Sequence, residues 1–313
     1  MNRRTTFILA AGAALGLATG AMAQDTKTVC YVTAADSHAY VTPANEALNA
    51  RAKELGIEIL SLSQEFSAQT GTDQLNTCIA RGVDGIILWP LDPQAYIPGL
   101  ARAQQAGIPV VLINSPMDPQ AEPLYSSFTG PDVYMEGQMA ADALNTALNG
   151  QGKVVIIAGQ AGNGTTIGRV DGFNEELAKI GSQIQVLDTV NADFDQQKSL
   201  VASRDLITRF GDEITGVYAN DDMMARGFLD AWKEARPDQP PPPVVGIGGQ
   251  KDAFAALQAG EMAATIIQSP AVDGRLAIDT MAKILNGETV EKRIPMDLTI
   301  VTPENVGEHE PAF

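Results

Sequence analysis

Short runs of β-branched and other apolar residues alternate along this chain with longer stretches in which apolar residues recur every three or four positions. The short runs predict buried strands, and the longer stretches predict amphipathic helices. In the first part of the chain the predicted strands are Val29–Thr33, Glu58–Leu62, Gly85–Trp89 and Pro109–Ile113, and the predicted helices between them are Pro43–Leu55, Thr70–Arg81 and Gln94–Ala106. Repeated strand–helix–strand units predict a parallel sheet with helices on both faces.

A second series of the same kind begins near Asp132. Its predicted helices are Asp132–Leu148, Arg169–Lys179, Asp195–Phe210, Met223–Glu234 and Asp252–Ala259, and its predicted strands are Lys153–Ala158, Gln185–Thr189, Gly216–Ala219 and Val244–Ile247. This series predicts a second α/β domain with a similar plan. The proline-rich stretch Arg236–Pro243 lies inside the series, so we interpret it as a stiff surface loop and not as a linker between domains.

The first residues have the pattern of a secretory signal peptide. Arg3 and Arg4 precede an apolar stretch, and the small residues before Gln24 predict cleavage after Ala23, which makes residues 1–23 the signal peptide. No cysteine stands at the cleavage point to carry a lipid anchor. No other segment is long and apolar enough to span a membrane. We therefore expect an exported, periplasmic protein.

The charge balance is strongly acidic, with 38 Asp and Glu residues against 21 Lys and Arg residues and a formal net charge of −17. Loss of Arg3 and Arg4 with the signal peptide would make the chain more negative still. Such a surface repels nucleic acid and anionic lipid. We expect no nucleic-acid partner.

The chain has two cysteines, Cys30 in the first predicted strand and Cys78 in the second predicted helix. Their spacing fits neither a metal site nor a Cys-x-x-Cys redox motif. In an oxidising compartment they could form one disulfide, and two separate buried thiols are the alternative.

Polar and aromatic residues gather in the loops that follow the predicted strands, which is where ligands bind in parallel α/β sheets. These loops are Asp36–Tyr40, Trp89–Asp92, Asn114–Asp118, Gln160–Thr166, Asn191–Asp195, Asn220–Asp222 and Gly246–Lys251. Uncharged hydrogen-bonding groups beside flat rings suit a neutral, polyhydroxylated molecule. Asp221 or Asp222 also suits the N-cap of the following helix.

Catalytic machinery is sparse in this sequence. The chain has two histidines, His38 in a candidate site loop and His309 in a tail that we expect to fray. No nucleophile elbow, zinc-protease motif or phosphate-loop lysine is present, and the glycines of Gly159–Gly164 do not have dinucleotide-binding spacing. These observations predict a protein that is not an enzyme and that uses no cofactor or metal.

Several motifs together resemble the ribose-binding-protein branch of the periplasmic sugar receptors that serve ABC importers. They are "ARGVDGIIL" (Ala80–Leu88), "ADFDQQKS" (Ala192–Ser199), "VYANDDMMARG" (Val217–Gly227), "VVGIGG" (Val244–Gly249) and "GEMAATIIQSP" (Gly260–Pro270). The resemblance covers almost the whole chain after the signal peptide. It implies a type I periplasmic-binding-protein fold, in which two doubly wound, parallel-sheet α/β domains are joined by a three-stranded hinge.

The resemblance also implies where the domains begin and end. The crossings fall near Phe128–Gly130, Gln268–Pro270 and Met296–Leu298, and the helix Ala271–Leu285 returns to the first domain. The N-terminal domain would then comprise residues 24–129 and 269–297, and the C-terminal domain residues 130–268 and 298–313.

Site residues follow from the same resemblance. Asn220 matches a ligand-binding asparagine, Phe194 a ring that packs against sugar, Gln268 a hinge glutamine, and Ser37 and Tyr40 contacts of the first loop. Four positions where the family carries charged ligand groups have Asn114, Ser115, Ile167 and Gly248 here. The candidate ligand-binding set, which also includes positions chosen for their loops, is Ser37, His38, Tyr40, Trp89, Asn114, Ser115, Asn163, Phe194, Asn220, Gly248 and Gln268.

The neutral replacements make ribose in the family's usual pose doubtful, since charged groups form the strongest hydrogen bonds to hydroxyls. A neutral sugar, deoxy sugar, polyol or small glycoside is the expected ligand. We expect a monomeric receptor that closes around this ligand at its hinge and delivers it to an ABC permease. The alternatives are a ligand-sensing receptor for a chemoreceptor or sensor kinase, and an exported carbohydrate-active enzyme.

Overall fold

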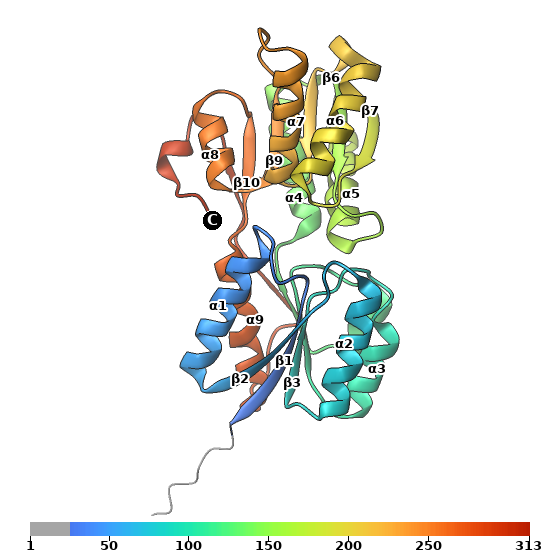
Figure 1. Cartoon of the computed structure of the whole chain (residues 1–313), viewed down its shortest axis with the longest axis vertical. Coiled ribbons are helices and arrows are strands. Elements are labelled where there is room, and N and C mark those ends of the chain that lie inside the picture. Colours follow the sequence, from blue (N-terminus) through green and yellow to red (C-terminus); the bar gives the residue numbers. More distant parts are fainter. Residues whose placement is uncertain (1–25) are drawn as a thin grey trace, which may run out of the picture.

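The computed structural model describes residues 26–313, so the predicted signal peptide lies outside the described residues. Two α/β units stand end to end, each built on a six-stranded sheet with helices on both faces (Figure 1). The predicted fold class is confirmed. In the part of the chain described, no helix is long and apolar enough to cross a bilayer.

The first sheet has the strand order β11-β5-β4-β3-β1-β2, and all its neighbouring strands are parallel. Its strands are β1 (Lys27–Thr33), β2 (Ile57–Ser63), β3 (Gly85–Leu88), β4 (Val110–Ile113), β5 (Ser127–Gly130) and β11 (Arg293–Pro295). The helices that accompany it are α1 (Val41–Leu55), α2 (Ala68–Arg81), α3 (Ile97–Gln105), the 3-10 helix η1 (Pro119–Leu124) and α9 (Pro270–Leu285). Helix α9 packs against α1, β4 and β5, although it comes late in the sequence.

The second sheet has the order β12-β10-β9-β8-β6-β7, with β12 antiparallel to β10 and the other neighbours parallel. Its strands are β6 (Gln151–Ala158), β7 (Gln183–Asn191), β8 (Gly216–Ala219), β9 (Val244–Gly248), β10 (Ala264–Ile267) and β12 (Thr299–Val301). The helices are α4 (Val133–Ala147), α5 (Gly164–Lys179), α6 (Gln196–Phe210), α7 (Asp222–Ala235), α8 (Lys251–Gln258) and the 3-10 helices η2 (Gly211–Glu213) and η3 (Val306–Glu308).

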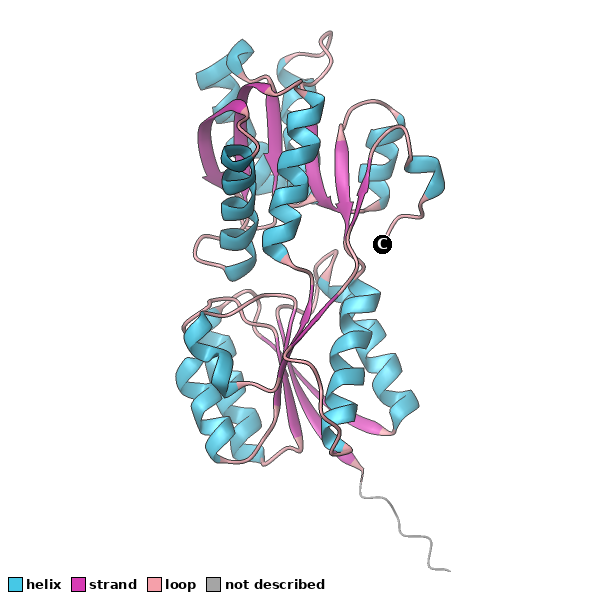
Figure 2. Cartoon of the chain, turned by 180° about the vertical axis from the view of Figure 1, so that it is seen from behind, coloured by secondary structure: helices cyan, strands magenta, loops and turns pink. Residues whose placement is uncertain are grey.

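The chain passes between the two sheets after β5, after β10, and between β11 and β12 (Figure 2). Phe128–Gly130, near which we expected a crossing, lies in β5 of the first sheet. The passage follows at Pro131 and Asp132, whose side chain accepts from the backbone of Tyr134 and Met135 and caps α4.

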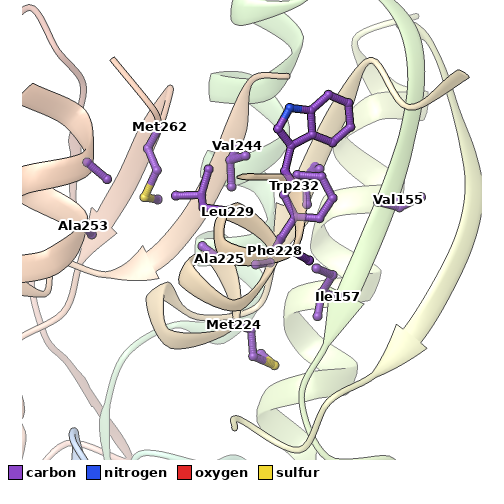
Figure 3. Close-up of a cluster of buried hydrophobic side chains, with 14 of the residues drawn as sticks. Val155, Ile157, Met224, Ala225, Phe228, Leu229, Trp232, Val244, Ala253 and Met262 are labelled. Atoms are coloured by element: carbon purple, nitrogen blue, oxygen red, sulfur yellow. The ribbon is translucent and has the colours of Figure 1, made fainter. Parts of the chain in front are cut away.

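Apolar side chains fill both faces of each sheet. Figure 3 shows one such cluster, in which Phe228 and Trp232 of α7 lie against Val155, Ile157 and Val244 of the second sheet. Burial of these side chains, each stabilising by about 1.5–3 kcal/mol for a fully buried large residue, holds α7 in place. The loop before α7 is thereby fixed at the carboxyl edge of the sheet.

The structure settles the question of the two cysteines in favour of a disulfide. Cys30 of β1 and Cys78 of α2 are bonded, with their Cα atoms 5.8 Å apart, and both are fully buried. The bond ties α2 to β1, the strand next to the β2 edge of the first sheet. A native disulfide of this kind stabilises by roughly 2–4 kcal/mol.

Two local predictions are wrong. Helix α5 begins at Gly164, five residues before the predicted start at Arg169, because Asn163 caps it by accepting from the backbone N–H groups of Thr165 and Thr166. The tail after η3 is held in place, since Ala312 N–H donates to the main-chain oxygen of Gly249 at 2.7 Å.

Candidate functional site

The carboxyl ends of the two parallel sheets face each other across a cleft that encloses a cavity of about 60 Å³. All the predicted site residues except Ser37 and Asn220 line this cavity. The other lining residues were not in the candidate ligand-binding set. Leu91, Thr165, Asp221, Ile247 and Gln250 belong to the candidate loops, whereas Val41, Phe66, Arg169 and Phe313 lie outside them. Among the described residues, no group of acidic, histidine or cysteine side chains is placed to hold a metal ion.

The wall from the first unit is built around a buried carboxylate, Asp273, in the first turn of α9. One of its oxygens accepts from the Tyr40 hydroxyl at 3.0 Å and from the Asn114 amide at 2.9 Å, and the other has no hydrogen-bond partner. Burial raises the pKa of Asp273 to about 7, against the opposing effect of these two donors. Asp273 therefore fixes the orientation of two predicted site residues from behind.

Aromatic rings form much of this wall. Tyr40 stands edge-to-face to Trp89 with ring centroids 6.0 Å apart, and both are buried. His38 stands edge-to-face to Phe66 at 5.3 Å. Burial lowers the pKa of His38, which favours the neutral imidazole. These rings offer flat apolar surfaces of the kind that line small-molecule sites.

The wall from the second unit contains a buried ion pair. Arg169 of α5 donates through Nε to Glu136 of α4 at 2.7 Å and through Nη1 to the main-chain oxygen of Asn220 at 2.7 Å. With its amide oxygen facing Arg169, Gln268 accepts from Nη2 at 2.7 Å and donates to Glu136 at 3.3 Å. Burial raises the pKa of Glu136, and the adjacent Arg169 opposes this shift.

A charged side chain therefore lines the cleft, although the four positions noted in the sequence carry neutral residues. Ile167 is 43% exposed, whereas Arg169 two residues later lines the cavity. The start of α5 explains the difference: Thr166, Arg169 and Phe173 follow at helical spacing from the cap and share the buried face. Counting from Asn163 as a cap would have found Arg169 from the sequence.

The polar residues after β8 have distinct roles. Asp221 is the N-cap of α7 and accepts from Met224 N–H at 2.7 Å. Asp222 begins the helix, and its carboxylate accepts from the Thr265 hydroxyl at 2.8 and 2.9 Å and from Gln250 N–H at 3.0 Å. Burial raises the pKa of both carboxyl groups to about 6.

Asn220 and Ser37 are not among the residues that line the cavity. Asn220 is fully buried behind the cavity wall, where its side-chain oxygen accepts from Gly159 N–H at 3.2 Å and its Nδ2 has no partner. Phe194 packs so closely over Gly159 that a Cβ there would lie 2.1 Å from the ring. Asn220 thus supports the backbone on which Phe194 rests. Ser37 is exposed and outside the cavity.

Hydrogen bonds join the two walls directly, so the structure is a closed arrangement. Asn163 donates to the main-chain oxygen of Leu91 at 3.1 Å, and the hydroxyls of Ser115 and Thr165 are 2.8 Å apart. His38 Nε2 lies 3.3 Å from the main-chain oxygen of Phe194. Gln160 donates to the main-chain oxygen of Phe66 at 3.3 Å.

Two α/β units that close over a cleft at their strand ends define a bilobal solute receptor. The chain belongs to the family described as periplasmic binding protein domain, which matches residues 29–289. It resembles the ribose-binding-protein branch of that family, as the sequence motifs indicated. The proteins of this family to which the chain is similar are solute-binding proteins and not enzymes.

Individual relatives cover nearly the full length. The chain is 30% identical to a xylitol-binding protein of Mycolicibacterium smegmatis, over 96% of this chain and 85% of that protein. It is also 30% identical to the ribose import binding protein RbsB of Haemophilus influenzae, over 96% of this chain and 100% of that protein. The crystal structure of a galactofuranose binding protein matches with a TM-score of 0.84 and 25% identity, covering 90% of this chain and 96% of that one.

Proposed function

We propose that this protein is a periplasmic receptor that encloses a small neutral sugar or polyol and delivers it to an ABC permease. The observation that carries the proposal is the composition of the cleft, where aromatic rings and hydrogen-bonding groups from both units converge on one cavity. Rings pack against the carbon–hydrogen faces of a sugar, and amide and hydroxyl groups bind its oxygens. Relatives named for xylitol and ribose support this ligand class.

The charges around the cleft favour a neutral ligand over an anionic one. Arg169 is neutralised by Glu136, so its free hydrogen-bonding capacity does not come with a net positive charge. Asp221 and Asp273 add carboxyl groups to the same region. A sugar phosphate or sugar acid would meet these groups without a compensating cation, which is costly in a buried site.

The proposed mechanism is closure at a hinge formed by the three passages between the sheets. We take the moving bodies to be residues 24–129 with 269–297 and residues 130–268 with 298–313. A ligand that contacts both walls stabilises the closed state by its additional affinity for that state. The closed outer surface would then be read by the permease. Monomeric action and export through the residues 1–23 signal peptide belong to the same proposal.

The ligand contacts that we propose are the predicted residues that line the cavity, together with Arg169. Trp89, Tyr40 and Phe194 supply rings, and Asn114, Ser115, Asn163 and Gln268 supply hydrogen bonds. His38 and Gly248 complete the set. Asn220 acts indirectly through Gly159 and Phe194. Ser37 is left out because it is exposed.

A thermal-shift and calorimetry screen tests this function. The purified protein is titrated with xylitol, D-ribose, D-fucose, D-glucose and, as the anionic control, ribose 5-phosphate. A ligand at 100 times its dissociation constant stabilises the folded state by about 2.7 kcal/mol, which gives a clear rise in Tm. We expect a shift with at least one neutral compound and none with the phosphate. Binding of the phosphate alone would overturn the proposal.

A further inference from the structure

The last residues of the chain reach back to the cleft. After η3 the C-terminal end lies between α8 of the second unit and α1 of the first (Figure 1). Ala312 N–H donates to the main-chain oxygen of Gly249 at 2.7 Å, and Lys251 N–H donates to the main-chain oxygen of Phe313 at 3.0 Å. Chain ends usually fray unless something ties them down. These two bonds tie this end to the start of α8.

The side chain of Phe313 crosses from the second unit to the first. Its ring lines the cavity and stands edge-to-face to Tyr40, with centroids 5.6 Å apart and planes at 89°. It also packs against the apolar cluster of the first unit that contains Tyr40, Val41 and Trp89. A ring held by the backbone of one unit therefore extends the aromatic wall of the other.

Gly248, near the end of the tail, leaves this part of the cavity wall without a side chain. This residue ends β9 and lines the cavity. Its φ of +146° and the Asp222 carboxylate 2.9 Å from where a Cβ would lie both disfavour any other residue. Phe313 is bonded to Lys251 and Ala312 to Gly249, so the ring is held close to this bare stretch of backbone.

We infer that Phe313 is a ligand-contacting residue that limits the size of the ligand. The ring would pack against the carbon–hydrogen face of a small monosaccharide or acyclic polyol and exclude bulkier compounds. This inference rests on the proposed function. It assigns to the C-terminal tail a part in ligand selectivity, alongside the strand-end loops that hold Tyr40 and Gly248.

The test uses the full chain with its purification tag at the N-terminal end, and the variants Phe313→Ala, Phe313→Leu and Phe313→Trp. Calorimetry measures dissociation constants for xylitol, D-ribose and D-glucose. We expect Phe313→Ala to weaken binding of the best five-carbon probe about tenfold, which corresponds to about 1.4 kcal/mol. Binding of D-glucose should improve relative to that probe. Phe313→Trp should weaken the binding of D-glucose relative to the five-carbon probe. The affinities of Phe313→Leu should lie between those of Phe313→Ala and the wild type.

The control is Glu310→Ala, which alters the same tail outside the cavity. It should leave all three dissociation constants within twofold of the wild-type values. Equal affinities and ratios in the wild type and Phe313→Ala would overturn the inference while leaving the proposed function intact. If the wild-type protein binds none of these three probes and no D-fucose, the proposed function fails and this inference fails with it.

Discussion

The two walls of the cleft bury ionisable groups in different ways. In the first unit Asp273 is a single carboxyl group satisfied by two neutral donors, Tyr40 and Asn114, with one oxygen left without a partner. In the second unit Glu136 and Arg169 form an ion pair that Gln268 and the backbone of Asn220 complete. The stability of the first wall therefore depends on the protonation of Asp273. The stability of the second wall depends on the presence of both Glu136 and Arg169.

The largest expected effect comes from removing the acid of the second wall. Glu136→Gln leaves the buried Arg169 without a counter-charge, and we expect the free energy of unfolding to fall by about 3–5 kcal/mol. Urea denaturation measures it. Adding Arg169→Met should recover part of the loss, because no buried charge then remains unpaired. A Glu136→Gln protein as stable as the wild type would mean that the second wall does not depend on the Glu136–Arg169 ion pair.

Glu234→Gln is the matched control for that experiment. Glu234 pairs with Arg204 at 2.8 Å, but both side chains are about half exposed, at 51% and 53%. Exposed ion pairs contribute about 0–1 kcal/mol because water already solvates both charges. The same chemical change should therefore have little effect at this surface position.

The buried carboxyl group of the first wall, Asp273, predicts a pH dependence of the free energy of unfolding. The pKa of Asp273 is raised to about 7 in the folded protein, against 3.8 as its ordinary value. The folded state therefore binds more protons between these values, and the free energy of unfolding falls as pH rises through that range. Below about pH 4 the protonated Asp273 contributes its full stabilisation to the folded state. By pH 8 the free energy of unfolding has fallen by at most about 4 kcal/mol through this group.

Asp273→Asn tests this dependence, since an amide oxygen can still accept from Tyr40 and Asn114 without becoming charged. The fall in unfolding free energy between pH 5 and pH 8 should be smaller in the variant than in the wild type. Asp221 and Asp222, whose pKa values are raised to about 6, also make the free energy of unfolding fall as pH rises. Both residues are present in the variant and in the wild type, so their contribution is the same in each. Identical pH profiles would show that Asp273 stays charged throughout.

The contact between the walls gives the next prediction. A Cβ at Gly164 would lie 2.4 Å from the main-chain oxygen of Pro116 across the cleft, and backbone atoms cannot rotate away. Gly164→Ala should therefore disfavour the closed state and weaken binding of the best neutral ligand about tenfold, or about 1.4 kcal/mol. Alanine has the higher helix propensity, so α5 itself should not lose stability.

Calorimetry gives the affinity of Gly164→Ala, and small-angle scattering with saturating ligand gives the fraction of closed molecules. Gly307→Ala is the control, because a Cβ there would meet nothing within 4 Å. If Gly164→Ala binds as tightly as Gly307→Ala, the bound state is more open than the structure described here.

Much of this architecture could be predicted from the sequence because it depends on local patterns. Apolar runs located β1 to β4 and β6 to β9, but not the short strands β5, β10, β11 and β12. The sequence "NDD" placed a cap before α7. The missed residues, Phe66, Asp273 and Phe313, come from segments that meet the cleft only through tertiary folding. Asp273 reaches Tyr40 only because α9 packs beside α1, at a sequence separation of 233 residues. No local pattern encodes such a contact.

The smallest predicted effect is a difference of about 1 kcal/mol between two pH values, and it separates the ring of Tyr40 from its hydroxyl. Tyr40→Phe keeps the edge-to-face contacts with Trp89 and Phe313 but removes the donor to Asp273. At pH 5, where Asp273 is mostly protonated, we expect a loss of about 1 kcal/mol in unfolding free energy, typical of one hydrogen bond. At pH 8 the loss should be larger, about 2 kcal/mol, because hydrogen bonds to charged groups are stronger. Urea denaturation of Tyr40→Phe at both pH values measures this difference, and equal losses would mean that the hydroxyl does not stabilise the ionised carboxylate.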